Sequence, residues 1–306
     1  MTFVTIGIIG VLFLIVVSGL YVFVIGFVRK ADIPWLVESE IRKTPFGKYY
    51  RQITDANQWL FDHNAQGLNI ESHDGLKLHG LWVPAEDARG TILLVHGYRS
   101  TYLVDFAPAF AYYHKMGLNL LIPAQRAHGE SGGKLITFGV KESQDMMLWC
   151  KYHNHHLSNC DIVLNGLSMG ASTVLMASGK ELPDNVIGIL SDCGFSSGRE
   201  IICHVAKRLK LPPVLIFPFI KLGARLFGRF DIDECPPKEA LKNCKKPVLF
   251  FHGEADSFVP CYMSEENFDS CPTRKKLVTV PGAGHGLCYP VDQEKYLKEL
   301  KEFFEV

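Results

Sequence analysis

The sequence lacks net charge, because 32 lysine and arginine residues balance 32 aspartate and glutamate residues. It also lacks interleaved basic and aromatic residues of the kind that contact nucleic-acid backbones and bases, so no nucleic-acid partner is expected. Its nine cysteines form no C-x-x-C pair and no spacing typical of a zinc site. No metal and no other cofactor is therefore expected.

An odd number of cysteines leaves at least one thiol free, and their scatter along the chain favours a reduced, cytosol-facing protein over a disulfide scaffold. The absence of an N-x-Ser/Thr sequon agrees with that environment. The 306 residues suit one α/β domain of about 240 residues behind a membrane segment, which is enough for a substantial core.

No charged residue occurs from Phe3 to Val28, a stretch that spans about 39 Å as a helix and is long enough to cross a bilayer. It lacks the basic n-region and A-x-A site of a signal peptide, which favours an uncleaved anchor. No lysine or arginine precedes it and several follow, so the rest of the chain is expected to face the cytoplasm. The basic residues that follow are Arg29, Lys30, Arg42, Lys43, Lys48 and Arg51.

Three units are predicted: a transmembrane anchor at 1–28, a juxtamembrane linker at 29–66 and a globular domain at 67–306. The linker is expected to be helical and to pack partly on the domain. Alternatively, its first aromatic residues mark the depth of the lipid headgroups: Trp35, Phe46 and Tyr49. The anchor contains no G-x-x-x-G, so a packed anchor dimer is not indicated, and the oligomeric state stays open.

The globular domain shows an α/β pattern. Leu68–Pro84 alternates apolar and polar residues around Asp74-Gly75, which predicts an antiparallel hairpin. Short apolar runs typical of strands buried on both faces follow, with helical stretches between them, so a mostly parallel sheet flanked by helices is predicted. The runs are 91–95, 118–122, 161–164, 186–190, 247–251 and 277–280, and the helical stretches are 101–116, 140–156, 171–181, 264–270 and 292–304.

Ser168 is the candidate nucleophile. It lies in Gly166-Leu167-Ser168-Met169-Gly170, between a predicted strand and a predicted helix. Such a sharp turn exposes a serine hydroxyl to an adjacent base, which a weak nucleophile requires. Gly129–Gly133 fits the same pattern around Ser131, but no helix follows it. The alternative for Ser168 is a serine that only caps the helix.

Polar residues follow each predicted strand, where the ligands of such sheets bind: His96, His128, Ser168, Asp192, Asp256 and His285. His285 is the candidate base, which accepts the proton of Ser168 and returns it to the leaving group. An acid is needed to orient the imidazole. Asp256, Asp192 and, less favoured, Glu254 are the candidates.

The segments around these residues resemble serine hydrolases of the α/β-hydrolase superfamily, near the prolyl-oligopeptidase-like and serine-aminopeptidase-like branches. The resemblance covers about residues 68–306, and the order Ser168, Asp256, His285 is that of this fold. It implies that Asp256 is the acid, and that the backbone N–H groups of Tyr98 and Met169 form the oxyanion hole. The matching segments are 93–98, 126–131, 166–170, 252–260 and 282–286.

Two histidines and an arginine near the site are assigned structural roles. His96 is more often a buried structural residue in this position than a base, because a triad needs one histidine. Arg126 and His128 are expected to organise the loop beneath the site. A cap is expected at about 196–246, where the strand-helix rhythm pauses.

Within the cap, residues 211–230 place Lys221, Arg225 and Arg229 at four-residue spacing. This pattern predicts either an amphipathic helix packed on the core, or a lid whose apolar face admits an acyl chain while its basic face meets anionic headgroups.

The leading hypothesis is a membrane-anchored serine hydrolase that cleaves a carboxylic ester, thioester or amide of a small-molecule or lipid-like acyl substrate through an acyl-enzyme on Ser168. An acyltransferase with the same triad and a non-catalytic binding protein of this fold are the alternatives. Two weaker ideas lack a second supporting element. They are a Cys288–His285 nucleophilic pair and a metal site at His153, His155 and His156.

Overall fold

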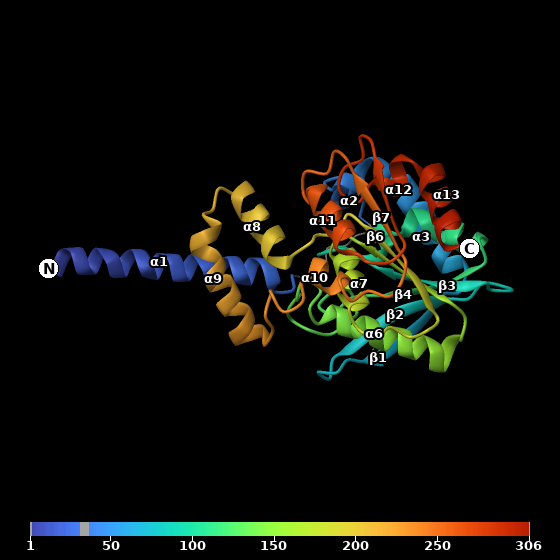
Figure 1. Cartoon of the computed structure of the whole chain (residues 1–306), viewed down its shortest axis with the longest axis horizontal. Coiled ribbons are helices and arrows are strands. Elements are labelled where there is room, and N and C mark those ends of the chain that lie inside the picture. Colours follow the sequence, from blue (N-terminus) through green and yellow to red (C-terminus); the bar gives the residue numbers. More distant parts are fainter. Residues whose placement is uncertain (1, 31–36, 306) are drawn as a thin grey trace.

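The computed structural model describes residues 2–30 and 37–305. An eight-stranded sheet forms the centre of a domain, and an arm that contains the long N-terminal helix projects from one side of it (Figure 1). The order across the sheet is β1-β2-β4-β3-β5-β6-β7-β8. The strands are β1 (Gln66–Glu71), β2 (Lys77–Val83), β3 (Gly90–Val95), β4 (Leu118–Pro123), β5 (Ile162–Leu167), β6 (Val186–Asp192), β7 (Val248–Gly253) and β8 (Lys275–Val280).

The predicted hairpin and all six predicted apolar runs are confirmed as strands. β1 and β2 pair antiparallel, β2 pairs antiparallel with β4, and every later pairing is parallel. Every residue of β3, β4, β5 and β7 is buried, as expected for strands covered on both faces. In the edge strands β1 and β8, exposed or half-buried positions recur along the strand.

Helices cover both faces of the sheet at nearly the predicted positions. They are α4 (Tyr102–Asp105), η2 (Ala107–Ala109), α5 (Phe110–Lys115), α6 (Glu142–Tyr152), η3 (His153–Leu157), α7 (Met169–Ser178), α10 (Pro237–Leu241), α11 (Tyr262–Ser270), α12 (Cys288–Val291) and α13 (Gln293–Phe304). The single helix predicted at 101–116 is divided into three pieces. Pro108 lies in the middle piece, and a proline has no N–H group to donate within a helix.

The segment before the sheet packs on the domain, as one of the two interpretations predicted. It forms α2 (Glu38–Ile41), η1 (Pro45–Tyr49) and α3 (Tyr50–Asp62). Ile41, Phe46, Ile53 and Leu60 are buried in the same apolar cluster as sheet residues. Burial of Phe46 in this core excludes it as a marker of headgroup depth, and Trp35 lies outside the described residues.

The arm consists of α1 (Thr2–Phe27) and the cap elements α8 (Gly198–Arg208), α9 (Pro213–Gly223) and η4 (Ala224–Gly228). Packing on the core was one of the two predictions for the cap helix, but α9 packs mainly on α1 and α8 (Figure 1). Glycines permit the close approach: a Cβ on Gly19 of α1 would lie 2.3 Å from the Cβ of Phe219, and one on Gly223 would lie 2.7 Å from the ring of Phe23.

The predicted basic face of the cap is wrong. Lys221 forms ion pairs with Asp231 at 2.9 Å and with Asp233 at 2.6 Å, and Arg225 also pairs with Asp231. Arg229 lies beyond η4 in the left-handed region, with a φ of 51°, so it leaves the helical face on which the spacing placed it. Lys221 and Arg225 therefore do not present free charges on this face.

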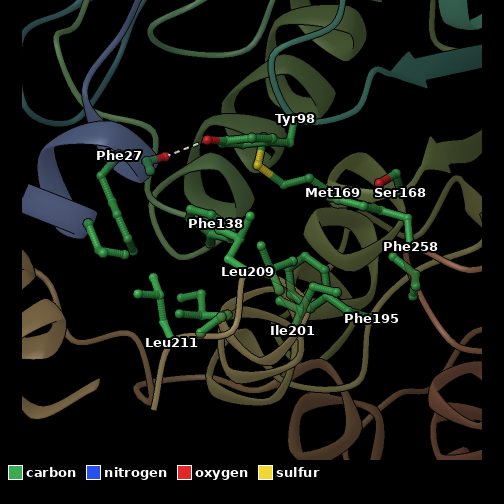
Figure 2. A pocket seen from close by; sticks show the side chains of 16 residues that line it. Phe27, Tyr98, Phe138, Ser168, Met169, Phe195, Ile201, Leu209, Leu211 and Phe258 are labelled. Carbon is green, nitrogen blue, oxygen red and sulfur yellow. Dashed lines mark hydrogen bonds between the residues drawn. The ribbon is translucent and has the colours of Figure 1, made fainter. Parts of the chain in front are cut away.

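Hydrogen bonds hold the C-terminal end of α1 against the domain. The Tyr98 hydroxyl donates to the carbonyl of Gly26 at 2.7 Å (Figure 2), and the Arg99 guanidinium donates to the carbonyls of Val28, at 3.0 Å, and Ile25. The last carbonyls of a helix have no intrahelical partner, so these donors cap the helix. The segment that carries Tyr98 therefore fixes the end of α1.

Candidate active site

Ser168 lies at the turn between β5 and α7. Its φ of 56° and ψ of −117° are unusual for a residue with a side chain, and such strain persists only where the surroundings impose it. Its N–H group donates to the carbonyl of Asp192 at 2.8 Å. A Cβ on Gly170 would lie 1.9 Å from the Val95 carbonyl oxygen, and one on Gly166 would lie 2.3 Å from the Gly170 carbonyl oxygen. Both glycines are therefore sterically required.

Ser131, in the second match to the pattern, has a structural role. Its side chain is buried, donates to the carbonyl of Ala124 at 2.6 Å and accepts from the N–H of His79 at 2.8 Å. No helix begins within 129–133. The prediction that helical context distinguishes Ser168 from Ser131 is confirmed.

Ser168, His285 and Asp256 form one continuous chain of hydrogen bonds. The Ser168 Oγ lies 2.8 Å from Nε2 of His285, and Nδ1 of His285 lies 2.7 Å from Oδ2 of Asp256. Asp256 follows β7 and His285 follows β8, so the carboxyl ends of neighbouring strands bring them together. With Nδ1 donating to the carboxylate, Nε2 is free to accept the serine proton.

Asp256 is held as a carboxylate. Burial acts to raise its pKa, but His252, His285 and the N–H of Val259 outweigh this and hold the pKa well below its ordinary value. Its Oδ1 accepts from the N–H groups of Phe258 at 2.8 Å and Val259 at 2.9 Å. A carboxylate that stays ionised can stabilise an imidazolium on His285.

His252 is a site residue that the sequence reasoning did not assign, although it begins one of the matching segments. Its Nε2 lies 3.5 Å from Oδ2 of Asp256 and donates to the carbonyl of Val259 at 2.8 Å, and its Nδ1 lies 2.6 Å from the Ser264 hydroxyl oxygen. Because a carbonyl oxygen only accepts, the contact with Val259 places a proton on Nε2. His252 therefore supports the loop that carries Asp256.

The rival acids do not meet His285. Asp192 is buried, and in the described residues its Oδ1 has no hydrogen-bond partner. Burial raises its pKa to about 6, opposed by a hydrogen bond from Cys288 and by the charges of His252 and His285. Glu254 accepts a hydrogen bond from Thr279 at 2.8 Å, at an exposed position. Of the three candidate acids, Asp256 is the one within hydrogen-bond distance of His285.

The two predicted oxyanion donors lie in segments next to Ser168. Met169 is the first residue of α7, where N–H groups lack intrahelical partners. Tyr98 lies in the turn after β3, and in the described parts of the chain its N–H donates to no other group. This turn passes close to the serine, because a Cβ on Gly97 would lie 3.3 Å from Cβ of Ser168.

Asp105 organises that turn and was not predicted. Its Oδ2 accepts from the N–H of Gly97 at 2.7 Å, and its Oδ1 accepts from the hydroxyl of Ser100 at 2.5 Å. Burial raises its pKa to about 6, against these hydrogen bonds. No pattern in the sequence marks this residue, because its role depends on the fold of the loop before it.

His96 is a buried structural residue. Its Nδ1 donates to the carbonyl of Gly97 at 2.9 Å, and its Nε2 accepts from the N–H of Gln125 at 3.0 Å. Burial, reinforced by His128, lowers its pKa to about 3, so the ring is neutral near pH 7. His128 accepts from the N–H of Arg99 at 3.0 Å, which links the two loops beside the site.

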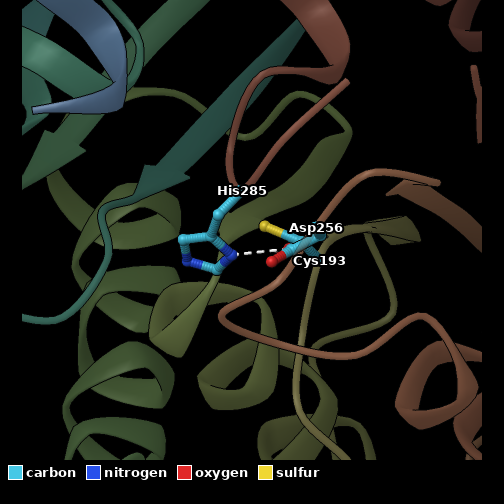
Figure 3. Close-up of side chains that lie close together, drawn as sticks. All are labelled: Cys193, Asp256 and His285. Atoms are coloured by element: carbon cyan, nitrogen blue, oxygen red, sulfur yellow. Dashed lines mark hydrogen bonds and ion pairs between the residues drawn. The ribbon is translucent and has the colours of Figure 1, made fainter. Parts of the chain in front are cut away.

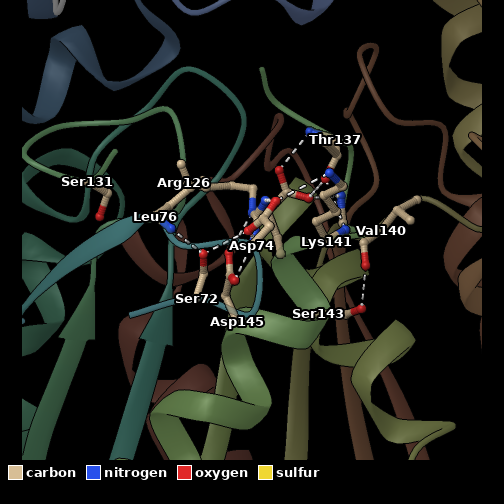
Figure 4. Close-up of polar contacts among 12 residues, drawn as sticks. Ser72, Asp74, Leu76, Arg126, Ser131, Thr137, Val140, Lys141, Ser143 and Asp145 are labelled. Carbon is tan, nitrogen blue, oxygen red and sulfur yellow. Dashed lines mark hydrogen bonds and ion pairs between the residues drawn. The ribbon is translucent and has the colours of Figure 1, made fainter. Parts of the chain in front are cut away.

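Arg126 anchors the loop beneath the site, as predicted. The guanidinium is buried between two carboxylates, at 2.7 Å from Asp145 and 3.0 Å from Asp74 (Figure 4). The Asp74 carboxylate belongs to the β1–β2 hairpin and Asp145 to α6, so one cation ties three elements together. Its contacts are those of a structural network.

The cysteines show no pairing, and all nine are free. Cys288 is buried, and burial, together with Asp192 and Cys193, raises its pKa well above its ordinary value, so it is a poor thiolate nucleophile. Cys193 lies beside Asp256 and His285, and within 2–30 and 37–305 these three form the one group with metal-ligating geometry (Figure 3). Both nitrogens of His285 are already bonded to Asp256 and Ser168.

His153, His155 and His156 do not form the suggested metal site. His153 is buried and bonds to the Thr91 hydroxyl at 2.8 Å and to Asn154 at 2.9 Å. Its Nε2 and Nδ1 are thereby occupied by polar side chains of the core.

An apolar pocket leads away from Ser168. It has a volume of about 720 Å³, part of which is open to solvent. Figure 2 shows Ser168 at one end and Phe27 of α1 at the other. α1 contributes Val22, Gly26 and Phe27 to its wall, and α8 contributes Ile201, Ile202 and Val205. The pocket suits an apolar group that extends from a reacting carbon at Ser168.

Comparison with known proteins gives no match to a family model. An uncharacterized protein of Bacillus subtilis, YqkD, is 27% identical over 241 residues, covering 77% of this chain and 78% of YqkD. The bem46 protein of Schizosaccharomyces pombe is 24% identical over 220 residues, covering 71% and 69%. The solved structure of the esterase Pf2001 from Pyrococcus furiosus has a TM-score of 0.63 at 24% identity, covering 82% of this chain and 92% of the esterase.

The order of strands, with an antiparallel pair at one edge and parallel strands after it, agrees with the likeness to the solved esterase. The chain therefore has the α/β-hydrolase fold, with an apolar N-terminal helix and a helical cap added to it.

Proposed function

We propose that this protein is a serine hydrolase that cleaves a carboxylic ester, thioester or amide through an acyl-enzyme on Ser168. The hydrogen-bond chain from Ser168 through His285 to Asp256, at the mouth of an apolar pocket, carries this proposal. A silent binding protein of this fold needs neither an intact triad nor a strained serine turn.

The proposed reaction has two halves. Nε2 of His285 takes the Ser168 proton as Oγ bonds to the carbonyl carbon, and the tetrahedral oxyanion accepts hydrogen bonds from the N–H groups of Tyr98 and Met169. Collapse breaks the bond to the leaving group, which receives the proton from His285. Water then attacks the acyl-enzyme by the same path and releases the acid.

An ester with an apolar acyl group is the favoured substrate. The pocket lining is almost entirely hydrocarbon, and the solved Pf2001 structure is that of an esterase. A peptide substrate of the prolyl-oligopeptidase-like branch finds few polar partners in this pocket. A comparison of ester, thioester and aminoacyl substrates on the same preparation tests this preference.

We also propose that α1 is an uncleaved membrane anchor that holds the domain at the cytoplasmic face. One apolar helix, Thr5–Phe27, is long enough to span a bilayer. Phe23 and Phe27 are buried against the cap and domain, and Tyr98 and Arg99 cap the helix, so cleavage removes part of the fold. Protease digestion of sealed vesicles tests the orientation, and digestion from the non-cytoplasmic side contradicts it.

A fluorophosphonate probe tests the chemistry. The wild-type protein and Ser131→Ala, which alters the other serine of the same pattern, should be labelled, whereas Ser168→Ala should not be. Circular dichroism of each variant confirms folding. Labelling of Ser168→Ala equal to that of wild type overturns the proposal. Added acceptor alcohols then show by product analysis whether water or an alcohol receives the acyl group, which distinguishes hydrolase from acyltransferase.

A further inference from the structure

The cap covers so much of α1 that the exposed part of this helix is too short to cross a membrane by itself. The residues of α1 from Thr5 to Leu14 are exposed, and from Ile15 onward the helix is partly covered. These ten exposed residues span about 15 Å, whereas the hydrocarbon core of a bilayer is about 30 Å thick. If α1 spans the bilayer, the part of α1 that contacts α9 must therefore also lie in the hydrocarbon.

The outer surface of the cap is apolar where it adjoins α1. We define the cap patch as five large apolar side chains, each with 43% to 85% of its surface exposed: Val214, Leu215, Leu222, Leu226 and Phe227. The ring of Phe227 lies 6.1 Å from that of Phe23, so the patch continues onto α1. Contiguous apolar surfaces of this kind mark interaction sites.

On α9 and η4, which carry the patch, Lys221 and Arg225 are paired with carboxylates, whereas Lys207, Arg208 and Lys210 at the end of α8 are exposed. The contact between Gly19 and Phe219 lies eight residues, or about 12 Å along the axis, before the end of α1 at Phe27. This depth is similar to that of interfacial helices, about 5–10 Å below the headgroups.

The pocket begins beside the part of α1 that contacts α9. Val22, Gly26 and Phe27 of α1 form one wall, and the exposed Leu209 and the half-buried Leu211, in the link between α8 and α9, line the pocket next to the patch. The route from the arm to Ser168 is apolar along its length (Figure 2). An acyl chain that lies in the leaflet beside α9 meets this route without crossing water.

We propose that the cap patch inserts into the leaflet that α1 enters, and that the pocket takes its substrate sideways from that leaflet. The occupant of the patch is the lipid bilayer, and the substrate class is a long-chain acyl ester resident in it. The chemistry of cleavage rests on the function proposed above, whereas insertion of the patch does not.

Insertion can be tested without catalysis. The full-length protein is placed in phosphatidylethanolamine and phosphatidylglycerol vesicles that contain a phospholipid with a diazirine on its acyl chain. After illumination, mass spectrometry should find lipid adducts in residues 209–227 as well as in α1. Adducts confined to α1 overturn the proposal, whatever the enzyme's activity. A patch without adducts in a protein that sediments as a dimer contradicts it in favour of a self-associating surface.

Sideways entry is tested with a variant of the patch and a matched control. Leu222→Glu/Leu226→Glu places charges on the patch, whereas Phe61→Glu makes a similar change on α3, where Phe61 is 61% exposed and Leu226 is 63% exposed. The patch variant should lose at least about tenfold in turnover of vesicle-borne p-nitrophenyl palmitate, because charges are costly in hydrocarbon. Turnover of soluble p-nitrophenyl butyrate and fluorophosphonate labelling should stay within about twofold of wild type.

Phe61→Glu should leave both substrates unaffected. An unchanged ratio of palmitate to butyrate turnover in the patch variant overturns sideways entry. Failure of the proposed function has a different outcome, because then wild type cleaves neither ester and Ser168 takes no probe, while the lipid adducts still decide insertion.

Discussion

Hydrogen bonds dominate the edge of the sheet that carries Ser168, whereas apolar packing dominates the arm. At the edge, Ser168, His285 and Asp256 each have defined hydrogen-bond partners, and buried groups such as Asp105 hold the loops around them. In the arm, apolar side chains pack on one another and many stay exposed. Directional bonds fix the position of reacting atoms, whereas apolar packing defines a volume. Under the proposed function, the edge carries out the reaction and the arm selects the substrate.

The largest expected effect is at the edge. Asp256→Asn removes the charge that stabilises the imidazolium and alters the tautomer of His285, so kcat should fall by about ten-thousand-fold. Asp192→Asn is the matched control, because Asp192 also ends a strand near the site yet does not contact His285. Its kcat should change by less than about fivefold. Equal losses in the two variants, measured by steady-state kinetics, contradict the assignment of the acid.

A substitution in the arm should change substrate choice and spare the chemistry. Val205 lines the pocket from α8, and Val205→Phe fills part of it. Long-chain esters should lose about ten- to a hundredfold in kcat/KM relative to butyrate, because pocket volume discriminates at this level per one or two methylenes. Val37→Phe, outside the pocket, is the control. An equal loss across a p-nitrophenyl ester series, from acetate to palmitate, shows that the arm does not select the acyl chain.

The loop between the two regions should show a smaller response than either. Asp105→Ala leaves the buried N–H of Gly97 without its acceptor, which loosens the turn that carries Tyr98. We expect kcat to fall by about tenfold with little change in KM. Asp105→Asn keeps an oxygen acceptor and should recover most of the activity. If Asp105→Ala raises KM alone, this residue positions the substrate pocket instead of the oxyanion turn.

The smallest effect is on stability and depends on pH. Burial raises the pKa of Asp192 to about 6 in the folded protein from an ordinary 3.8. Protonation of Asp192 therefore favours the folded state, and its contribution is complete below about pH 4 and lost as pH rises through about 6. Asp192→Asn removes this contribution, so its Tm relative to wild type should rise between pH 4 and pH 7. A constant difference in Tm across this range contradicts the raised pKa.

Most of the sheet and the site core could be predicted because both leave local patterns. Each buried strand appears as an apolar run, and each candidate residue follows one directly, as Asp256 follows β7 and His285 follows β8. Parallel strands then bring these ends together without further information. Asp105 could not be found in this way, since its role arises from a loop that folds back over it.

The arm could not be predicted because its contacts are distant in sequence. The packing of Gly19 on Phe219 joins residues two hundred positions apart, and an apolar helix does not specify its partner. The spacing of Lys221 and Arg225 suggested a basic face, but their partners Asp231 and Asp233 lie outside the helical pattern. The periodicity of a helix does not show which charged side chains from other segments pair with it.

The hydrogen bond from Tyr98 to Gly26 has a practical consequence for purification. Deleting the N-terminal helix is a common route to a soluble sample, yet here it removes Val22, Gly26 and Phe27 from the pocket and leaves the side chains of Tyr98 and Arg99 without their partners on α1. A shortened protein therefore has an open-sided cleft in place of the pocket. Inhibitor screens run on it select compounds for a site that the full-length protein does not have.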